Sequence, residues 1–214
     1  MMGQAVIVAN GSISDYSFYN DIFYDECDYI ICADGAARHL KKYNILPDLL
    51  VGDFDSISNE DLEFYKSSGT EVVKFPVEKD MTDTELAVSS AQDRGYKKIT
   101  IVGGLGTRAD HSLSNVFLLV KMLKQGLSGR IIDENNEIIV IDKQVNIERK
   151  KDFKITLLSL SKEVTGVNTQ GLYYTLKDAT LVMGSSYGVS NEFISDIAQI
   201  SIKSGLLMII LSKD

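Results

Sequence analysis

The stretch Leu49-Leu50-Val51-Gly52-Asp53-Phe54-Asp55-Ser56 determines how the rest of the chain is interpreted. Its apolar half predicts a short buried strand that ends at Gly52. If the backbone stays extended after this glycine, Asp53 and Asp55 lie on one side of the chain. Two like charges at that spacing repel each other unless a cation lies between them, and Mg²⁺ with oxygen ligands is the simplest choice. The alternative is that the end of the stretch only forms a turn before a helix that starts near Asn59.

The composition is that of an ordinary globular protein. The chain has 214 residues, of which 44% are hydrophobic and 24% are charged, so it holds one large domain or two small ones. A net charge of −8 argues against a nucleic-acid surface. The two cysteines, Cys27 and Cys32, predict free thiols in a reducing compartment. We find no leader peptide and no apolar run of membrane-spanning length, so we expect a soluble cytoplasmic protein that binds neither nucleic acid nor membrane.

The first part of the chain alternates between two kinds of segment. The expected strands are 5–9, 29–33, 49–52, 71–75 and 98–102, and the expected helices are 15–24, 36–43, 59–67, 82–93 and 108–124. Asn59 is the expected N-cap of the helix 59–67, and residues 82–85 (TDTE) fit a capping box that starts the helix 82–93. This alternation predicts an α/β fold with a parallel, Rossmann-like sheet and flanking helices. After Gly126, short apolar runs separated by turns predict a C-terminal all-β sandwich. We therefore expect two domains, 1–125 and 126–214.

Acidic residues follow four of the five predicted strands. They are Asp34, Asp53, Asp55, Asp80, Asp83 and Asp110. In an open parallel sheet, ligands bind at the carboxyl ends of the strands. One acid at such a position is commonly a turn former or a first-turn residue of a helix. Acids in four neighbouring loops of one edge are not common, and they indicate a site for a metal or a nucleotide.

A glycine-rich turn, residues 103–107, joins the last of these strands to a helix. Its glycines let backbone N–H groups approach an anion, and the helix N-terminus adds a favourable dipole. The spacing matches neither the dinucleotide fingerprint nor the Walker loop, so the turn alone is a weak phosphate signal. Arg108, which follows it, is equally suited to a bidentate contact with phosphate and to a salt bridge with a neighbouring acid.

The helix after this turn carries two further candidates. Asp110 shares a stripe with Leu113 and Phe117, and we expect this stripe to pack on the sheet. A carboxylate on a buried face needs a partner or a metal, because burying it unpaired is costly. His111 is one of two histidines, and a capping role for it is as well supported as a direct one.

Three motifs in this order resemble the successive signatures of the thiamine pyrophosphokinase family. They are residues 52–56 (GDFDS), 79–85 (KDMTDTE) and 103–111 (GGLGTRADH). In the β-rich part, residues 171–176 (GLYYTL) and 188–193 (GVSNEF) are similar to the thiamine-binding segments of that family. The resemblance covers nearly the whole chain. It implies an α/β catalytic domain that binds ATP and Mg²⁺, a β-sandwich that binds thiamine, and a homodimer.

The implied reaction transfers pyrophosphate from ATP to the hydroxyl of thiamine, which gives thiamine diphosphate and AMP. The implied catalytic acids are Asp53, Asp55, Asp80, Asp83 and Asp110, and the implied Mg²⁺ ligands are Asp53, Asp55 and Asp83. The implied ATP contacts are Asp34, Gly103, Gly104, Gly106, Arg108 and His111. The implied thiamine contacts are Tyr173, Tyr174, Ser190 and Asn191.

Some assignments stay open at this point. Tyr173 and Tyr174 stand where many family members carry another pair, often with tryptophan, so the stacking residue is undefined. Lys79 occupies a variable position and is given no role, and the aspartate that accepts the thiamine proton is not identified. The short connection near residues 126–129 limits how far the β domain can fold back over its own chain, which favours active sites shared between two chains.

Two other classes of function also stay open. One is a different Mg²⁺-dependent phosphotransferase or hydrolase, which would keep the acidic edge but be indifferent to Tyr174 and Asn191. The other is a non-catalytic nucleotide- or metal-binding module, which predicts binding without turnover. Incubation with ATP, Mg²⁺ and thiamine, followed by identification of the products by mass, distinguishes the three.

Overall fold

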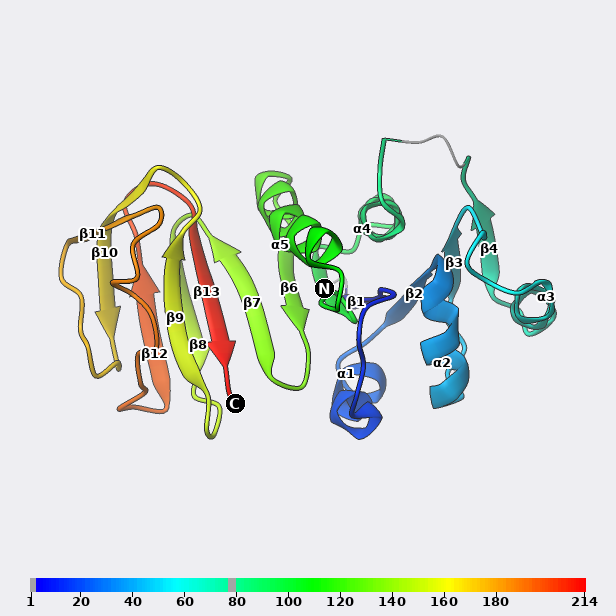
Figure 1. Cartoon of the computed structure of the whole chain (residues 1–214), viewed down its shortest axis with the longest axis horizontal. Coiled ribbons are helices and arrows are strands. Elements are labelled where there is room, and N and C mark those ends of the chain that lie inside the picture. The colour runs from blue at the N-terminus through cyan, green and yellow to red at the C-terminus, as the bar shows by residue number, and fades with distance from the viewer. Residues whose placement is uncertain (1–2, 77–79) are drawn as a thin grey trace. The chain divides into compact units, whose positions relative to one another are not determined.

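The computed structural model describes residues 3–76 and 80–214, and the chain divides into two compact units, Met1–Glu134 and Asn135–Asp214 (Figure 1). The first unit extends past residue 126 because the strand β6 (Ser128–Ile132) pairs in parallel with β5 (Lys98–Val102). The described part of the first unit therefore has one strand more than the sequence predicts.

All strand pairs of the first unit are parallel, and their order is β4-β3-β2-β1-β5-β6. The strands before β5 are β1 (Gln4–Val8), β2 (Tyr29–Ala33), β3 (Leu49–Gly52) and β4 (Glu71–Lys74). β1 and β3 are buried along their whole length, as expected for strands covered on both faces. The predicted α/β fold is confirmed.

Helices cover both faces of this sheet (Figure 1). They are α1 (Asn20–Tyr24, after the 3₁₀ turn Tyr16–Tyr19), α2 (Ala37–Tyr43), α3 (Asn59–Ser67), α4 (Asp83–Asp93) and α5 (Ala109–Lys124). The predicted cap of α4 is confirmed, because the side chain of Thr82 accepts a hydrogen bond from the N–H of Glu85. The predicted cap of α3 is wrong by one residue, because Ser58 rather than Asn59 accepts a hydrogen bond, from the N–H of Asp61.

The buried face of α5 differs from the predicted one. The helix buries Asn115, Val116, Leu118, Leu119 and Met122, a spacing that is typical of one helix face. Leu113 and Phe117 are 56% and 58% exposed. The prediction that Asp110 shares a buried stripe with these two residues is therefore wrong.

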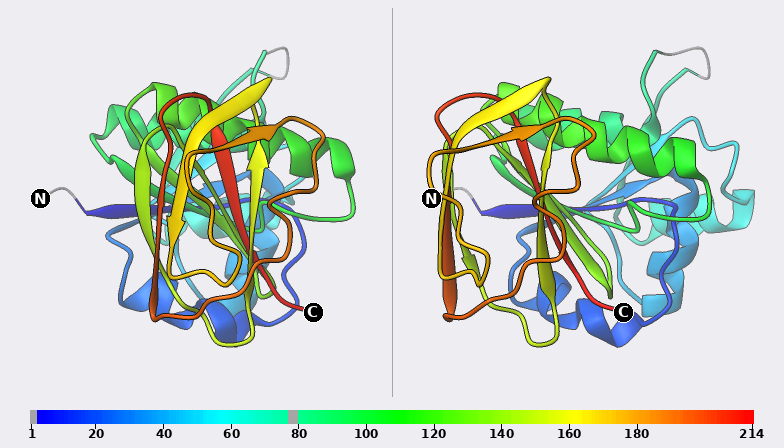
Figure 2. Two further views of the ribbon diagram at one scale, coloured as in Figure 1. Left: turned by 90° about the vertical axis from the view of Figure 1, so that its left-hand side faces the viewer. Right: turned by 60° about the vertical axis from the view of Figure 1, so that its left-hand side comes forward.

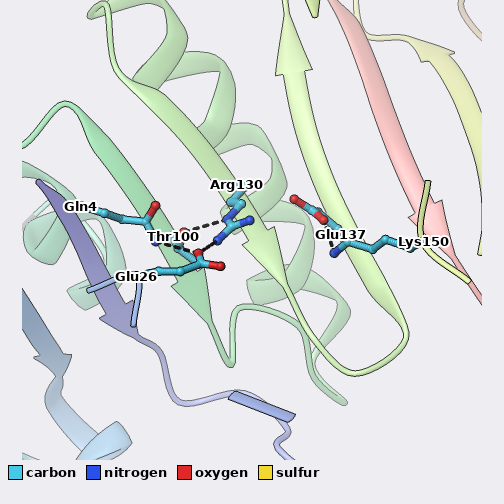
Figure 3. A network of polar contacts seen from close by, with 6 residues as sticks. All are labelled: Gln4, Glu26, Thr100, Arg130, Glu137 and Lys150. Atoms are coloured by element: carbon cyan, nitrogen blue, oxygen red, sulfur yellow. Dashed lines mark hydrogen bonds and ion pairs between the residues drawn. The ribbon is translucent and has the colours of Figure 1, made fainter. Parts of the chain in front are cut away.

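A polar network joins three strands of the first unit's sheet to Glu26, which lies in the segment before β2, and it is away from the carboxyl ends of the strands (Figure 3). Arg130 of β6 donates hydrogen bonds to Oγ1 of Thr100 in β5 (2.8 Å) and to Oε2 of Glu26 (2.5 Å). The side chain of Gln4, the first residue of β1, donates to the same carboxylate oxygen (3.4 Å). These contacts connect three neighbouring strands, so we assign the network a structural role.

Seven strands form the second unit (Figure 2). They are β7 (Asn136–Ile141), β8 (Gln144–Glu148), β9 (Lys154–Ser159), β10 (Glu163–Gln170), β11 (Ala179–Val182), β12 (Ile197–Ser201) and β13 (Leu207–Ser212). Their antiparallel pairs give the orders β7-β13-β9 and β11-β10-β12-β8. One core is shared by both groups, with Ile155 and Ile209 from the first and Val167 and Ile200 from the second. The absence of helices from residues 135–214 agrees with the predicted all-β domain.

Among the residues that the structure describes, none of the helices combines the length and the apolar character needed to cross a bilayer.

Candidate functional site

A cavity of about 650 Å³ opens at the carboxyl edge of the first unit's sheet. Its walls come from the loop after β1, the end of β2, the first turns of α2, α4 and α5, and the glycine-rich turn after β5. The predicted site residues that line it are Asp34, Asp83, Gly103, Gly104, Gly106, Arg108 and His111. The edge of the sheet that was expected to bind ligands is thus hollowed, as the topology predicts.

Three carboxylates gather beside this cavity. Asp34, Asp53 and Asp55 each offer an oxygen atom, and these atoms lie within 4.8 Å of one another. Asp34 is only 4% exposed, and its Oδ1 has no hydrogen-bond partner in the described part of the chain. Burial raises the pKa of Asp34 above its ordinary value, and the negative charges of Asp83 and Asp53 add to that effect. An unpartnered buried oxygen beside two further carboxylates fits a hard divalent cation.

A turn, rather than an extended strand, brings Asp53 and Asp55 together. Phe54 has a φ of 65°, so the backbone leaves the β region directly after Asp53. The N–H of Asp55 donates to Oδ1 of Asp53 (3.1 Å), and the hydroxyl of Ser56 donates to Oδ1 of Asp55 (2.7 Å). The predicted extended geometry is therefore wrong, and the turn considered as its alternative is the means by which the two acids approach each other.

Gly52 allows the ends of β2 and β3 to lie side by side. A Cβ atom placed on this glycine would lie 2.7 Å from Cβ of Asp34, which is closer than such atoms approach in proteins. The sequence marked Gly52 only as the end of a strand. Its structural consequence is that the acid after β2 sits directly against the acids after β3.

Two further predicted acids of the reaction centre, Asp80 and Asp83, differ in position. Asp83 begins α4 and lines the cavity, where its charge contributes to the raised pKa of Asp34. Asp80 is exposed and belongs to neither the cavity lining nor the three-carboxylate group formed by the described residues. The structure thus brings Asp83 to the site and leaves Asp80 in solvent.

The glycine-rich turn and the loop after β1 form one continuous wall. The N–H of Gly11 donates to the carbonyl of Gly103 (2.8 Å), and the N–H of Ser12 donates to that of Leu105 (2.8 Å). Gly103 has a φ of +63°, and a Cβ there would lie 2.4 Å from the carbonyl oxygen of Ala9. Glycine is required at this position by both the backbone conformation and the lack of space.

Arg108 and Asp110 form an ion pair with each other at the start of α5. Nε of Arg108 lies 3.2 Å from Oδ1 of Asp110, and Nη2 lies 2.5 Å from Oδ2. The hydrogen bonds from Arg108 lower the pKa of Asp110 to about 2. Arg108 and His111 line the cavity, whereas Asp110 does not belong to the lining that the described residues form. Of the two partners suggested for Arg108, the structure shows the neighbouring acid.

Sequence reasoning missed several lining residues, chief among them Asn10, Arg38 and His39. His39 is buried, and its Nε2–H donates to the carbonyl of Gly11 (3.0 Å), so its Nδ1 accepts a hydrogen bond from the hydroxyl of Tyr16 (2.9 Å). Burial lowers the pKa of His39, which favours this neutral form. A usable signal was present in the sequence. α2 follows β2 directly, so the first turn of that helix must lie at the same edge as Asp34.

The four predicted thiamine contacts lie together in the second unit. Tyr173 and Tyr174 are both 64% exposed, and their ring centres are 4.9 Å apart in an edge-to-face arrangement. Asn191 is only 6% exposed. Its Oδ1 accepts hydrogen bonds from the N–H groups of Tyr174 and Glu192 (both 2.9 Å), and its Nδ2 donates to the carbonyl of Tyr174 (2.8 Å). Ser190 is exposed, with a φ of 58°. The amide of Asn191 therefore holds Tyr174 in place.

Comparison with known proteins assigns the chain to a family. The model of the thiamin pyrophosphokinase catalytic domain matches residues 21–132. The model of the thiamin pyrophosphokinase vitamin B1 binding domain matches residues 142–207. The chain belongs to the thiamine pyrophosphokinase family. The family inferred from the motifs is thus confirmed, although Lys79, the first residue of the second motif, lies outside the described residues.

Individual thiamine pyrophosphokinases agree with this assignment. The thiamine pyrophosphokinase of Bacillus subtilis (strain 168) is 31% identical over 213 residues, which cover 97% of this chain and 98% of that protein. A crystal structure of thiamine pyrophosphokinase from Bacillus subtilis has a TM-score of 0.88 at 30% identity and covers 99% of both chains. A family protein from Enterococcus faecalis gives a TM-score of 0.85 at 29% identity, over 99% of this chain and 100% of that chain.

Proposed function

We propose that this protein transfers pyrophosphate from ATP to the hydroxyl of thiamine and releases thiamine diphosphate and AMP. The observation that carries this proposal is the joint position of two features at one cavity. The buried carboxylate of Asp34, whose Oδ1 has no partner among the described residues, and the glycine-rich turn at residues 103–107 both line it. The first feature suits a divalent cation, and the second suits the phosphates that such a cation accompanies.

The acids beside the cavity would hold Mg²⁺. Asp53 and Asp55 are retained from the predicted ligand set, and Asp34 joins them because its oxygen belongs to the same group. Asp83 adds negative charge at the start of α4. When bound, Mg²⁺ neutralises charge on the phosphate oxygens of ATP.

The remaining residues of the first unit would position ATP. Gly103, Gly104 and Gly106 belong to the wall along which the phosphate groups would lie, and Arg108 supplies a positive charge at its end. Pyrophosphate transfer requires the hydroxyl of thiamine to reach the β-phosphorus while negative charge grows on the surrounding oxygens. The contribution of the protein is therefore mainly positioning and charge neutralisation.

The second unit would bind thiamine. Thiamine is a cation with an aromatic pyrimidine, which suits the exposed faces of Tyr173 or Tyr174. Ser190 offers an exposed hydroxyl, and Asn191 keeps Tyr174 in position through its buried amide. We further propose a homodimer in which the thiamine-binding residues of one chain complete the cavity of the other. The free thiols of Cys27 and Cys32 support a cytoplasmic location.

The test is incubation with ATP, Mg²⁺ and thiamine, followed by mass identification of the products. We expect AMP and thiamine diphosphate in equal amounts, and no product when EDTA removes the metal. ADP with thiamine monophosphate would instead indicate a different phosphotransferase, and ATP binding without turnover would indicate a non-catalytic module. Light scattering in the same buffer measures the mass of the particle, and a monomer would contradict the shared active sites.

A further inference from the structure

The loop after β1 is a wall of the cavity that lacks regular secondary structure. Residues 10–14 all line the cavity, and they follow the central strand of the sheet. On one side this loop is fixed by the backbone of the glycine-rich turn, through the N–H groups of Gly11 and Ser12. His39 fixes it from a second side, through the carbonyl of Gly11.

The far end of this loop is held by one carboxylate from a distant part of the chain. Oε1 of Glu134 accepts hydrogen bonds from the N–H of Ser14 (2.7 Å), the N–H of Asp15 (2.7 Å) and the hydroxyl of Ser14 (3.1 Å). Glu134 is half-buried, and it follows the end of β6. It is outside the cavity lining that the described residues form. Glu134 therefore contacts the loop that forms the wall without itself lining the cavity.

An ionised carboxylate is well suited to this position. Two successive N–H groups and a hydroxyl converge on one oxygen, and a carboxylate accepts hydrogen bonds without needing to donate any. Burial on its own raises the pKa of Glu134. Hydrogen bonds from the N–H groups of Asp15, Glu134 itself and Ser14 lower this pKa by more than burial raises it, so the net shift is downward. A glutamine would have the same shape, but it would bring no charge and would add an N–H₂ group that needs an acceptor.

We propose that Glu134 is a positioning residue for the nucleotide, which fixes the loop after β1 as a wall of the cavity. It sets the affinity for ATP without contacting ATP. The inference rests on the proposed function in one respect, namely that ATP is the ligand of this cavity. A residue that only stabilised the fold would change the melting temperature and leave the balance between the two substrates unchanged.

The first experiment compares Glu134→Ala, Glu134→Gln and Glu63→Ala with the wild-type protein. Glu63 is a matched control, because its side chain is 72% exposed on α3 and forms an ion pair with the nearby Lys66. We expect Glu134→Ala to raise the KM for ATP about tenfold and to leave the KM for thiamine unchanged. Glu134→Gln should have a smaller effect, and Glu63→Ala none. Equal changes in both KM values, or a lower melting temperature with unchanged KM values, would overturn the proposal.

The second experiment needs no nucleotide. Hydrogen exchange followed by mass spectrometry should show faster exchange of residues 10–15 in Glu134→Ala than in the wild type or in Glu63→Ala. Unchanged exchange would overturn the proposal even if the enzyme makes thiamine diphosphate. If the wild type binds ATP but makes no thiamine diphosphate, the proposed function fails. The inference then still stands, provided that Glu134→Ala exchanges faster and binds ATP more weakly by calorimetry.

Discussion

The ends of β2 and β3 and the end of β5 both carry aspartates at the edge of one sheet, yet the two regions hold negative charge in opposite ways. Asp34 is 4% exposed and its Oδ1 has no partner among the described residues. The side chain of Asp110 is 65% exposed and is paired with Arg108. In the first region a buried carboxylate oxygen stays without a partner among the described residues, whereas in the second the carboxylate is exposed and paired with an arginine. Position at a sheet edge therefore does not by itself determine how the charge of an acid is compensated.

The largest effect should come from removing the buried carboxylate of Asp34. We expect Asp34→Asn to lower the activity at least about 100-fold at limiting Mg²⁺, because a metal ligand is replaced by a weaker one. In metal-free protein the same change should raise the melting temperature, by roughly 2–4 °C, because a buried carboxylate beside other acids is replaced by a neutral group. Steady-state kinetics and calorimetry in EDTA measure the two effects.

The control for this prediction is Asp142→Asn, the same chemical change in the turn between β7 and β8, where the side chain is exposed. It should alter neither activity nor melting temperature. Normal activity of Asp34→Asn at limiting Mg²⁺ would show that Asp34 does not bind the metal. Asp34 and Asp110 would then not differ in their role in the reaction.

In the region after β5, the stability of the protein should depend on the space around Gly103 rather than on the charge of Asp110. We expect Gly103→Ala to destabilise the protein by about 2–3 kcal/mol, because its Cβ would meet the carbonyl of Ala9 in a backbone conformation that alanine avoids. Gly126→Ala is the matched control, since Gly126 has a φ of +76° but nothing within 4 Å of the added Cβ. Urea unfolding measures both. Equal losses in the two variants would show that conformation alone, and not the contact between the two loops, makes glycine necessary.

The smallest effect should follow from Asp110→Asn. Because both partners of its ion pair are exposed, the melting temperature should not change measurably. We expect less than about a tenfold change in catalytic efficiency, since only the orientation of Arg108 is disturbed. The double variant Arg108→Ala/Asp110→Asn should resemble Arg108→Ala alone. A loss as large as that of Asp34→Asn would place Asp110 at the reacting atoms and remove the distinction between the two regions.

Much of the fold could be predicted because it depends on local patterns. Short runs rich in apolar residues gave β2 and β5 with the bounds that the structure shows, and the pair Thr82 and Glu85 gave the start of α4. β6 was missed because its residues 128–130 are not apolar, so its place beside β5 is set by pairing rather than by pattern.

The candidate site was predictable only in part, for a related reason. Its acids are adjacent to strand ends, so topology alone brings Asp34 and Asp53 to one edge. The exposure of Asp110 depends on how α5 is rotated about its axis, and the structure buries the face with Val116 and Met122 rather than the predicted stripe with Leu113 and Phe117. His39 and Glu134 act through backbone groups of a loop, and such contacts leave no motif in a sequence.

The close approach of Gly52 to Asp34 has a genetic consequence. In cells that depend on this protein for thiamine diphosphate, any side chain at position 52 would push on Asp34, so a residue with no functional group would behave in a mutational scan like a member of the reaction centre. Suppressors that make room by shortening residue 34 would restore soluble protein and would not restore growth. At the contact between residues 52 and 34, a selection for soluble protein and a selection for enzymatic activity would therefore recover different variants.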